Sequence, residues 1–322
     1  MARLDGENSI VSRNGGSIAA PGATEEIVIE KCNYFATVGL WPLRHVLDPH
    51  RWLSNFEDEE RELAVHLLNQ FIYFSETLVD QIFRAAFQIL SRSSTRPGES
   101  FLASQRDWRS YVDSAIITYV TGEKPSPTDS GPTFARKARQ ILGIREDQIM
   151  TPDDAINQLI HHGARPVVFV DDFVGTGNQF DATWTRQTTT DSVTISFERL
   201  SQQRGFNFSY CPAFATESGI QTLRRTCPQV TLCAGNVIPS TYGATAEDSV
   251  IWPADKRTLG KEFLRRASER AGLPNTNGLA TNDWQGFNRL GLTLALHNSV
   301  PDATLPIFYW NENGWRPLIP RT

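Results

Sequence analysis

The sequence predicts an α/β fold in which a parallel sheet is flanked by helices. Segments rich in β-branched and aromatic residues predict strands at 167–170, 206–216 and 230–238. Segments with helical periodicity alternate with them at 152–162, 196–204 and 217–226. This alternation is typical of parallel strands joined by crossover helices. The first strand reads VVFV, and such an uninterrupted apolar run indicates a strand covered on both faces.

A long helix is predicted before the sheet. Residues 54–92 contain no Gly or Pro, and apolar pairs recur about every four residues. Ser54 and Glu57 form a candidate capping box at its start, and the helix could break near Ser75. Its wide apolar stripe fits a core helix or, as the alternative, the interface of an oligomer.

Three regions are predicted along the chain. Residues 1–25 are rich in Gly, Ser and Ala and lack the apolar centre of a signal peptide, which predicts a disordered arm. Residues 26–108 are expected to form a helical N-terminal region packed on the core. Residues 109–322 are expected to form the α/β domain with a C-terminal extension.

Composition restricts the function classes. The 322 residues carry a formal net charge of −5, which argues against nucleic-acid binding by bulk charge. No run of about 18 apolar residues occurs, so we expect neither a transmembrane helix nor a membrane partner. The cysteines form no Cys-x-x-Cys pair, and we expect them to be reduced and buried in a cytoplasmic protein. They are Cys32, Cys211, Cys227 and Cys233.

Two carboxylates and a glycine turn directly follow the VVFV strand. Asp171 and Asp172 come first, and Gly175, Thr176 and Gly177 precede polar residues that can open a helix. In open α/β sheets, ligands bind at this carboxyl end of the strands. Glycine allows close backbone approach to a phosphate, and a helix N-terminus favours an anion. Carboxylates accept hydrogen bonds from sugar hydroxyls or hold Mg²⁺ partly through water. The pattern indicates a ribose phosphate site, and a polar loop without a ligand is the alternative.

The same stretch resembles the fingerprint of type I phosphoribosyltransferases. The resemblance implies that Asp171 and Asp172 contact the ribose 2′ and 3′ hydroxyls of phosphoribosyl pyrophosphate and hold Mg²⁺ indirectly. It also implies that a loop of five residues cradles the 5′-phosphate. These are Gly175, Thr176, Gly177, Asn178 and Gln179. The chain departs from the fingerprint at Asn178, where a second glycine is usual.

A closer resemblance is to the phosphoribosyltransferase-like domains of bacterial conflict systems, which occur beside retron reverse transcriptases and other anti-phage modules. It is carried by residues 122–140, 168–179 and 290–310, and it extends over roughly residues 30–321. It implies a phosphoribosyltransferase-like parallel sheet with an N-terminal helical layer and a C-terminal extension. It further implies a role in anti-phage defence. Asp302 and Ala303 stand where the family tends to have Asn.

Two loops supply further candidate ligand residues. The Pro-rich segment 123–134 lies between a predicted strand and a predicted helix, and a loop in this place is a candidate ligand loop. The resemblance makes Asp129, Ser130 and Gly131 its centre, on the pyrophosphate side or at the mouth of the site. A plain surface connection is the alternative. His297 and Asn298 start a later loop that could lie over the ribose or base, although a lone His is often structural.

A basic stripe on the helix predicted at 256–271 has two readings. Arg257, Lys261 and Arg265 share one face at spacings of four residues. They could meet a nucleic-acid backbone, or they could form a solvated face.

Three hypotheses for function follow. The first is an enzyme that binds phosphoribosyl pyrophosphate or a nucleotide with Mg²⁺ and acts at ribose C1, as a phosphoribosyltransferase or as a relative that cleaves nucleotide N-glycosidic bonds. The second is a non-catalytic nucleotide-binding sensor or scaffold that works through a partner protein. The third is a component docked on nucleic acid. The resemblance implies a reverse transcriptase, its nucleic acid or a DNA-binding protein as partners.

Overall fold

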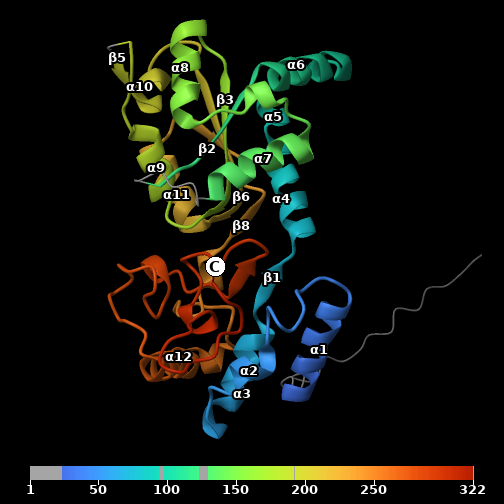
Figure 1. Cartoon of the computed structure of the whole chain (residues 1–322), viewed down its shortest axis with the longest axis vertical. Helices are drawn as coiled ribbons and strands as arrows, with labels where there is room; N and C mark the ends of the chain where they lie inside the picture. The colour runs from blue at the N-terminus through green and yellow to red at the C-terminus, as the bar shows by residue number, and fades with distance from the viewer. Residues whose placement is uncertain (1–23, 95–97, 123–129, 192, 322) are drawn as a thin grey trace, which may run out of the picture.

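The structure is a computed structural model that describes residues 24–94, 98–122, 130–191 and 193–321. These residues form two halves, which Figure 1 shows one above the other. The upper half contains a five-stranded sheet covered by helices. The lower half combines the first helices of the chain with its C-terminal segment.

All strands of the main sheet are parallel. Their order is β2-β3-β6-β7, and β8 also pairs with β6. The strands are β2 (Ile116–Tyr119), β3 (Pro166–Val174), β6 (Asn207–Thr216), β7 (Val230–Leu232) and β8 (Asn236–Ile238). The predicted α/β class is therefore confirmed. The strand predicted at 230–238 is divided in two by residues 233–235. A Cβ atom on Gly235 would lie 2.2 Å from the carbonyl oxygen of Ile82.

Helices cover both faces of this sheet, as the VVFV run predicts. Val168 and Val170 share a core with α4 and α7, whereas Val167 and Phe169 share a core with α8–α11. All four side chains are fully buried. The helices are α4 (Glu76–Ile89), α7 (Ser130–Leu142), α8 (Pro152–His162), α9 (Asn178–Thr185), α10 (Phe197–Ser201) and α11 (Glu217–Thr226). A small hairpin of β4 (Thr188–Thr190) and β5 (Val193–Ile195) lies beside α8.

The chain does not form one helix over 54–92, and the break considered near Ser75 is observed. The chain forms α2 (Pro49–Leu53), α3 (Asp58–Asn69), β1 (Ile72–Phe74) and then α4. The break arises because β1 pairs in parallel with β9 (Leu294–Leu296), a strand far away in the sequence. The capping box is also shifted: Glu57 and Glu60 form it at the start of α3, and Ser54 instead ends α2.

A separate core joins the first helices to the C-terminal segment. Its buried residues come from 28–71 and from 244–319. Trp52 illustrates the contact, because its ring stacks on Phe308 at 5.3 Å and its Nε1 donates to the Ile307 carbonyl at 2.8 Å. The remaining elements of this half are α1 (Glu25–Thr37), α12 (Arg257–Ala271) and four short 3₁₀ helices, η2 (Ser240–Tyr242), η3 (Ala254–Lys256), η4 (Phe287–Arg289) and η5 (Pro306–Phe308).

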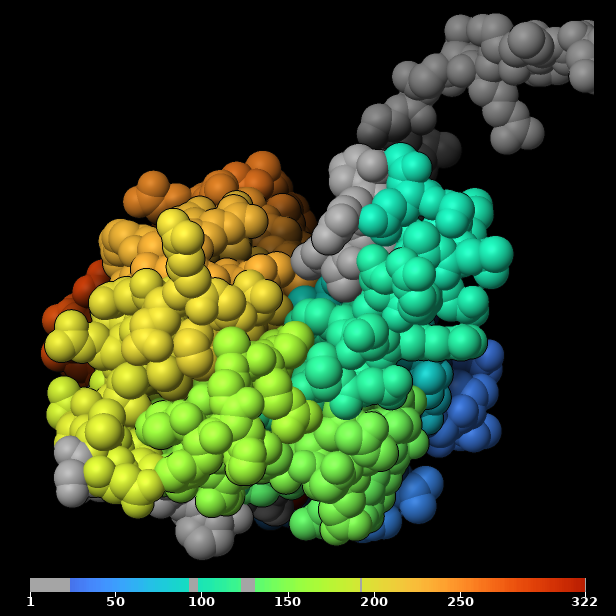
Figure 2. Space-filling view, turned by 90° about the horizontal axis from the view of Figure 1, so that it is seen from above, coloured from blue at the N-terminus to red at the C-terminus, as the bar shows by residue number. Residues whose placement is uncertain are grey.

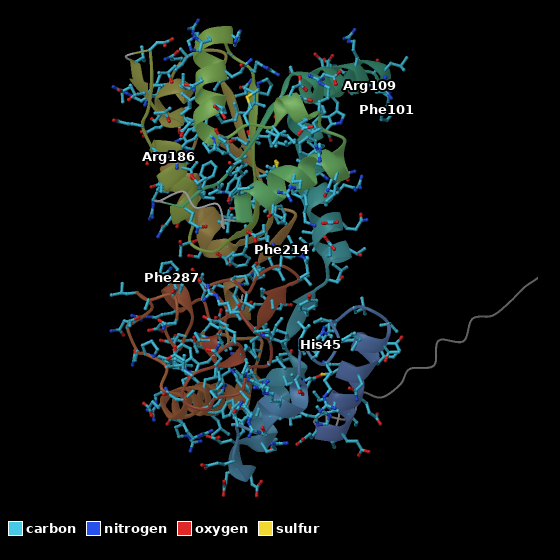
Figure 3. All side chains as sticks on the ribbon, viewed as in Figure 1. His45, Phe101, Arg109, Arg186, Phe214 and Phe287 are labelled. Carbon is cyan, nitrogen blue, oxygen red and sulfur yellow. The ribbon has the colours of Figure 1, made fainter. Side chains whose placement is uncertain are left out.

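Helix α6 (Phe101–Ser114) lies at the rim of the upper half, and none of its residues is fully buried. Figure 2 looks onto this end of the molecule and shows α6 in teal along one side. Figure 3 labels Phe101 and Arg109, which both lie on this outlying helix. The short helix α5 (Ser91–Ser94) contacts it. No helix in the described ranges has the length and apolar character needed to cross a bilayer.

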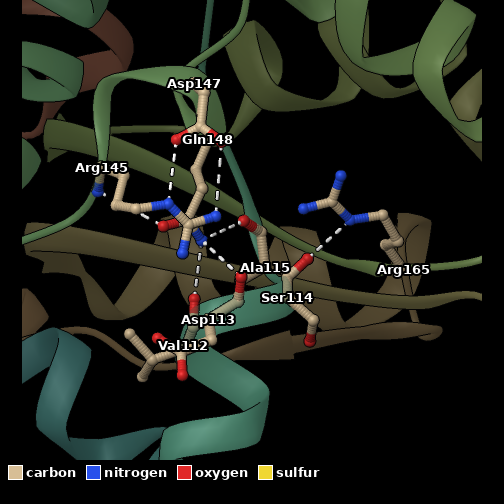
Figure 4. Close-up of polar contacts among 8 residues, drawn as sticks. All are labelled: Val112, Asp113, Ser114, Ala115, Arg145, Asp147, Gln148 and Arg165. Atoms are coloured by element: carbon tan, nitrogen blue, oxygen red, sulfur yellow. Dashed lines mark hydrogen bonds and ion pairs between the residues drawn. The ribbon is translucent and has the colours of Figure 1, made fainter.

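Gln148 anchors the end of α6 to the first strand of the sheet. Gln148 is the last residue of the short helix η1 (Glu146–Gln148) and is 2% exposed. Its side-chain amide donates to the carbonyls of Val112 and Ala115 at 2.7 and 2.8 Å (Figure 4). Arg165 caps the neighbouring carbonyl of Ser114 at 2.7 Å. The carbonyls at a helix end have no partner within the helix, so these side chains satisfy them.

We expect the substitution Gln148→Leu to lower the free energy of unfolding by about 1–3 kcal/mol, because buried acceptors then lose their donor. Chemical denaturation measures the difference. The control is Arg145→Ala, which removes an exposed ion pair with Asp147 and should have a much smaller effect. Equal losses in both variants would contradict this account of the junction.

Candidate functional site

The two carboxylates of the motif lie near the carboxyl end of β3, an interior strand. β3 continues past them to Val174 and stays paired with β6. Asp171 and Asp172 are only 4% and 6% exposed. Asp171 accepts hydrogen bonds from the Tyr210 hydroxyl at 2.7 Å and from the Asp172 amide at 3.0 Å. Asp172 accepts one from the Ser299 hydroxyl at 3.3 Å.

Burial makes this pair electrostatically unfavourable. Burial and then the neighbouring charge of Asp172 raise the pKa of Asp171 well above its usual range, although the Tyr210 hydrogen bond acts in the opposite direction. Burial and the charge of Asp171 likewise raise the pKa of Tyr210. A cation or a hydrogen-bond donor that entered beside the pair would stabilise the ionised carboxylates.

The loop after β3 leads directly into a helix. We call residues 175–179, which the sequence predicts to bind a phosphate, the phosphate loop. Gly177 is the N-cap of α9, with φ of +86°, and a Cβ atom there would lie 3.0 Å from Cγ of Leu223. Only glycine fits this conformation without strain. The amide groups of the first helical turn have no intrahelical acceptor, so they can face a bound anion.

The next strand holds the phosphate loop in place. The Thr216 hydroxyl, at the end of β6, donates to the Gly175 carbonyl and accepts from the Gly219 amide at 2.9 Å. A Cβ atom on Gly219 would lie 2.6 Å from the Gly175 carbonyl oxygen. The N-terminus of α11 therefore packs directly against the loop.

The carboxylates and the phosphate loop open into one cavity of about 630 Å³. Its other side is formed by a set of residues from the C-terminal segment, which we call the C-terminal wall. The wall comprises Thr281, Phe287, Leu290, Arg321 and residues 298–303. Figure 3 labels Phe287 at the edge of the lower half, where this half faces the sheet. A cavity of this size suits a nucleotide-sized ligand.

The cavity brings most of the predicted site residues together. Both carboxylates, all five residues of the phosphate loop and Asn298 line it. The Asn298 Oδ1 atom is buried and has no hydrogen-bond partner in the described part of the chain. Such an atom is a candidate acceptor for a ligand hydrogen bond.

Other predicted site residues lie elsewhere. His297 is not among the described lining residues; its Nε2 lies 3.8 Å from Glu76. Burial and the nearby Lys137 lower the pKa of His297, which favours the neutral ring. Gly131 packs against the Val120 carbonyl at the start of α7. Ser130 begins α7, its side chain is not described, and Asp129 lies outside the described residues.

Sequence reasoning did not find several residues of this site. Tyr210 and Ser299 contact the carboxylates, and Arg321 lines the cavity. Thr216 and Gly219 had a usable signal, because they lie at and just after the end of the strand next to β3, and neighbouring parallel strands end at the same edge. Ser299 directly follows Asn298 in the loop predicted to lie over the ligand, whereas Arg321 had no signal, since only the tertiary fold brings it to the sheet.

The basic stripe on α12 is largely occupied by partners within the chain. Arg257 donates to the Ser249 carbonyl at 2.8 Å, and Arg265 pairs with Glu262 and Glu269. Lys261 is exposed. These contacts favour the reading of a solvated face over a phosphate-binding one.

Mg²⁺ is compatible with this donor set when most of its ligands come from outside the protein. Among the described residues, no cluster of three or more His, Cys, Asp or Glu side chains could enclose a metal ion. Mg²⁺ commonly uses one or two carboxylates together with water and substrate phosphates. Asp171 and Asp172 supply such a pair.

An inner parallel strand that carries two carboxylates and a glycine loop at its carboxyl end is the arrangement expected of a phosphoribosyltransferase-like protein. A family model described as PRTase-CE matches residues 49–321. The match covers more than half of the chain, so the chain belongs to the PRTase-CE family. No curated protein matches the chain.

We expect the substitution Asp171→Asn to stabilise the ligand-free protein, and the gain to grow as the pH rises. A carboxyl whose pKa is raised by folding stabilises the fold below its unfolded pKa, near 3.8, and this contribution is lost as the pH rises through the folded pKa. The variant has no such loss. Thermal unfolding of both proteins between pH 4 and 8 measures the difference.

The control is Asp248→Asn, which removes a carboxylate from an exposed position. Its stability difference from the wild type should change less over the same pH range. A difference for Asp171→Asn that stays constant or shrinks with rising pH would contradict the burial argument.

Proposed function

We propose that this chain binds a ribose 5-phosphate donor or a nucleotide with Mg²⁺ in the 630 Å³ cavity and acts at ribose C1. The observation that carries the proposal is the shared cavity of two buried carboxylates and the phosphate loop. The family membership supports the same ligand class.

The phosphate loop is suited to the 5′-phosphate. The amides at the start of α9 and the helix dipole favour an anion, and Gly177 leaves the backbone accessible. Asp171 and Asp172 would accept hydrogen bonds from the ribose hydroxyls. When a bond at C1 breaks, positive charge develops on the ribose ring. Fixed carboxylates in a buried site stabilise such a charge more effectively than water does.

The charge of the cavity favours a divalent cation. Among the described lining residues, three carboxylates face a single guanidinium, that of Arg321. A phosphorylated ligand would add negative charge to this surface. Bound Mg²⁺ would neutralise phosphate charge and help to position the leaving group. Asp171 and Asp172 would hold it, partly through water.

The C-terminal wall would contact the base or acceptor. Phe287 offers an aromatic surface, and Asn298 offers the unsatisfied Oδ1 atom. An aromatic ring and a buried amide acceptor can together stack on and hydrogen-bond a heterocycle. We propose this wall as the part that selects the second group of the ligand.

The second candidate is a non-catalytic nucleotide-binding sensor or scaffold. The observation that favours it concerns Arg321, whose guanidinium is paired with Asp302. A pyrophosphate leaving group would then meet no unpaired cation among the described lining residues. Such a module would act through a partner in anti-phage defence. We propose as this partner a reverse transcriptase, its nucleic acid or a DNA-binding protein. We also propose a cytoplasmic location, which suits four buried free cysteines.

Ligand binding should be weakened by Asn178→Asp at the first residue of α9. The side chain is exposed, and an acidic residue at a helix start is favourable, so the fold should be kept. The new carboxylate would repel the phosphate, and we expect affinity for ribose 5-phosphate to fall by about tenfold or more. Calorimetry with Mg²⁺ measures this.

The matched control is Gln203→Glu, an exposed position away from the cavity with the same change in net charge. It should bind like the wild type. Equal affinities in all three proteins would remove the phosphate loop from the proposal.

Turnover separates the enzyme from the binding module. Purified protein with Mg²⁺ would be incubated with phosphoribosyl pyrophosphate or with nucleotides, and released pyrophosphate or free base would be measured. An enzyme should show release that Asp172→Asn abolishes while the fold is kept. Binding without any release, in the presence of an extract of candidate acceptors, would favour the second candidate.

A further inference from the structure

We propose that Arg321 recognises a second anionic group of the ligand, and that Asp302 occupies its guanidinium until the ligand displaces it. This inference rests on the proposed function, because it assumes that the first anionic group, the 5′-phosphate, lies in the phosphate loop. It assigns specificity to a residue pair on the C-terminal wall.

Arg321 is held in a fixed orientation at the cavity. Its guanidinium lies over the Tyr309 ring, 4.9 Å from the centroid, and donates to the Tyr309 hydroxyl at 3.2 Å. It also forms an ion pair with Asp302. Burial lowers the pKa of Arg321, but the guanidinium stays charged at any ordinary pH. Stacking on an aromatic ring fixes the plane of the group and reduces the entropy lost when it binds a ligand.

The charge distribution of the cavity points to a ligand for this group. Arg321 is the single basic residue among the described residues that line the cavity, and Asp302 lines the same cavity. The ion pair is therefore accessible to whatever enters. A guanidinium binds phosphate or carboxylate through two parallel hydrogen bonds, so a ligand anion can replace Asp302 with similar geometry.

The position of Arg321 defines the class of ligand. The phosphate loop belongs to the sheet half, and Arg321 belongs to the opposite wall of the same 630 Å³ cavity. A ligand that binds both the phosphate loop and Arg321 therefore carries two separated anionic groups. Such a second group could be the pyrophosphate on ribose C1 or a carboxylate on a heterocyclic base.

If the ligand displaces Asp302 from Arg321, substitutions of these two residues should change ligand affinity in opposite directions. In Arg321→Gln the ligand loses its cation. In Asp302→Asn the ligand no longer competes with a carboxylate, and the cavity loses one negative charge. A purely structural ion pair would instead make both substitutions harmful. This difference in sign separates a ligand-binding pair from a structural one.

The test is calorimetry with Mg²⁺ on the full chain. The probes are ribose 5-phosphate, phosphoribosyl pyrophosphate and an aromatic heterocycle that carries a carboxylate. We expect Arg321→Gln to weaken at least one of the two probes with a second anionic group by about tenfold or more and to leave ribose 5-phosphate within about twofold. Asp302→Asn should strengthen the same probe several-fold. Whichever probe responds identifies the source of the second anion.

Several results would overturn the inference. Unchanged affinity of Arg321→Gln for both anionic probes would do so, and so would weaker binding in Asp302→Asn. If Arg321→Gln does not fold, Arg321→Lys replaces it, since Lys keeps the charge but loses the two-point contact and should bind at an intermediate strength. If the wild-type protein does not bind ribose 5-phosphate, the proposed function is rejected, and the inference is rejected with it.

Discussion

The pairing of β1 with β9 is the contact on which the cavity depends. β1 directly precedes α4, which packs on β6, and β9 directly precedes the loop with Asn298 and Ser299. Three residue pairs therefore fix the C-terminal wall over the carboxyl end of β3. Phe74 of β1 extends the contact to Phe214 of β6, with ring centroids 4.5 Å apart. Without this pairing, the carboxylates would lie at the open carboxyl end of the sheet rather than in a cavity.

The same enclosure makes the carboxylates costly. A charged group loses hydration when it is buried, and two adjacent carboxylates repel each other. The hydroxyl groups of Tyr210 and Ser299 donate hydrogen bonds to Asp171 and Asp172, and these bonds offset part of the cost. The protein thus retains an arrangement that folding alone would not favour. Functional sites often carry such a cost, because a ligand or cation repays it when it binds.

Local pattern predicted the elements whose partners lie nearby in the sequence. The helix bounds at 152–162 and 217–226 match α8 and α11. The VVFV run was correctly predicted as a strand covered on both faces, because period and apolarity are local properties. The order of strand, carboxylates, glycine turn and helix also predicted where residues 175–179 lie, at the carboxyl end of the sheet, where they line the cavity.

Long-range pairing escaped the same reasoning. Apolar periodicity continues through residues 70–75, so it could not reveal that Ile72 pairs with Leu294. The pattern of a helix and that of a three-residue strand do not differ over so short a segment. Arg321 was missed for the same reason, since its role depends on the wall that this pairing positions. The error in the helix and the omission of Arg321 therefore have one cause.

The two walls of the cavity differ in how they can respond to a ligand. On the sheet side, the phosphate loop is fixed by backbone geometry, by Thr216 and by the close approach of Gly219. On the other side, the contacts are side chains carried by a segment that shares its core with the first helices. A ligand that bridges both walls therefore couples the two halves of the molecule. An enzyme would use that coupling to exclude water from ribose C1, and a sensor would use it to present a different surface to its partner. The geometry serves both, so chemistry at C1, rather than the fold, distinguishes them.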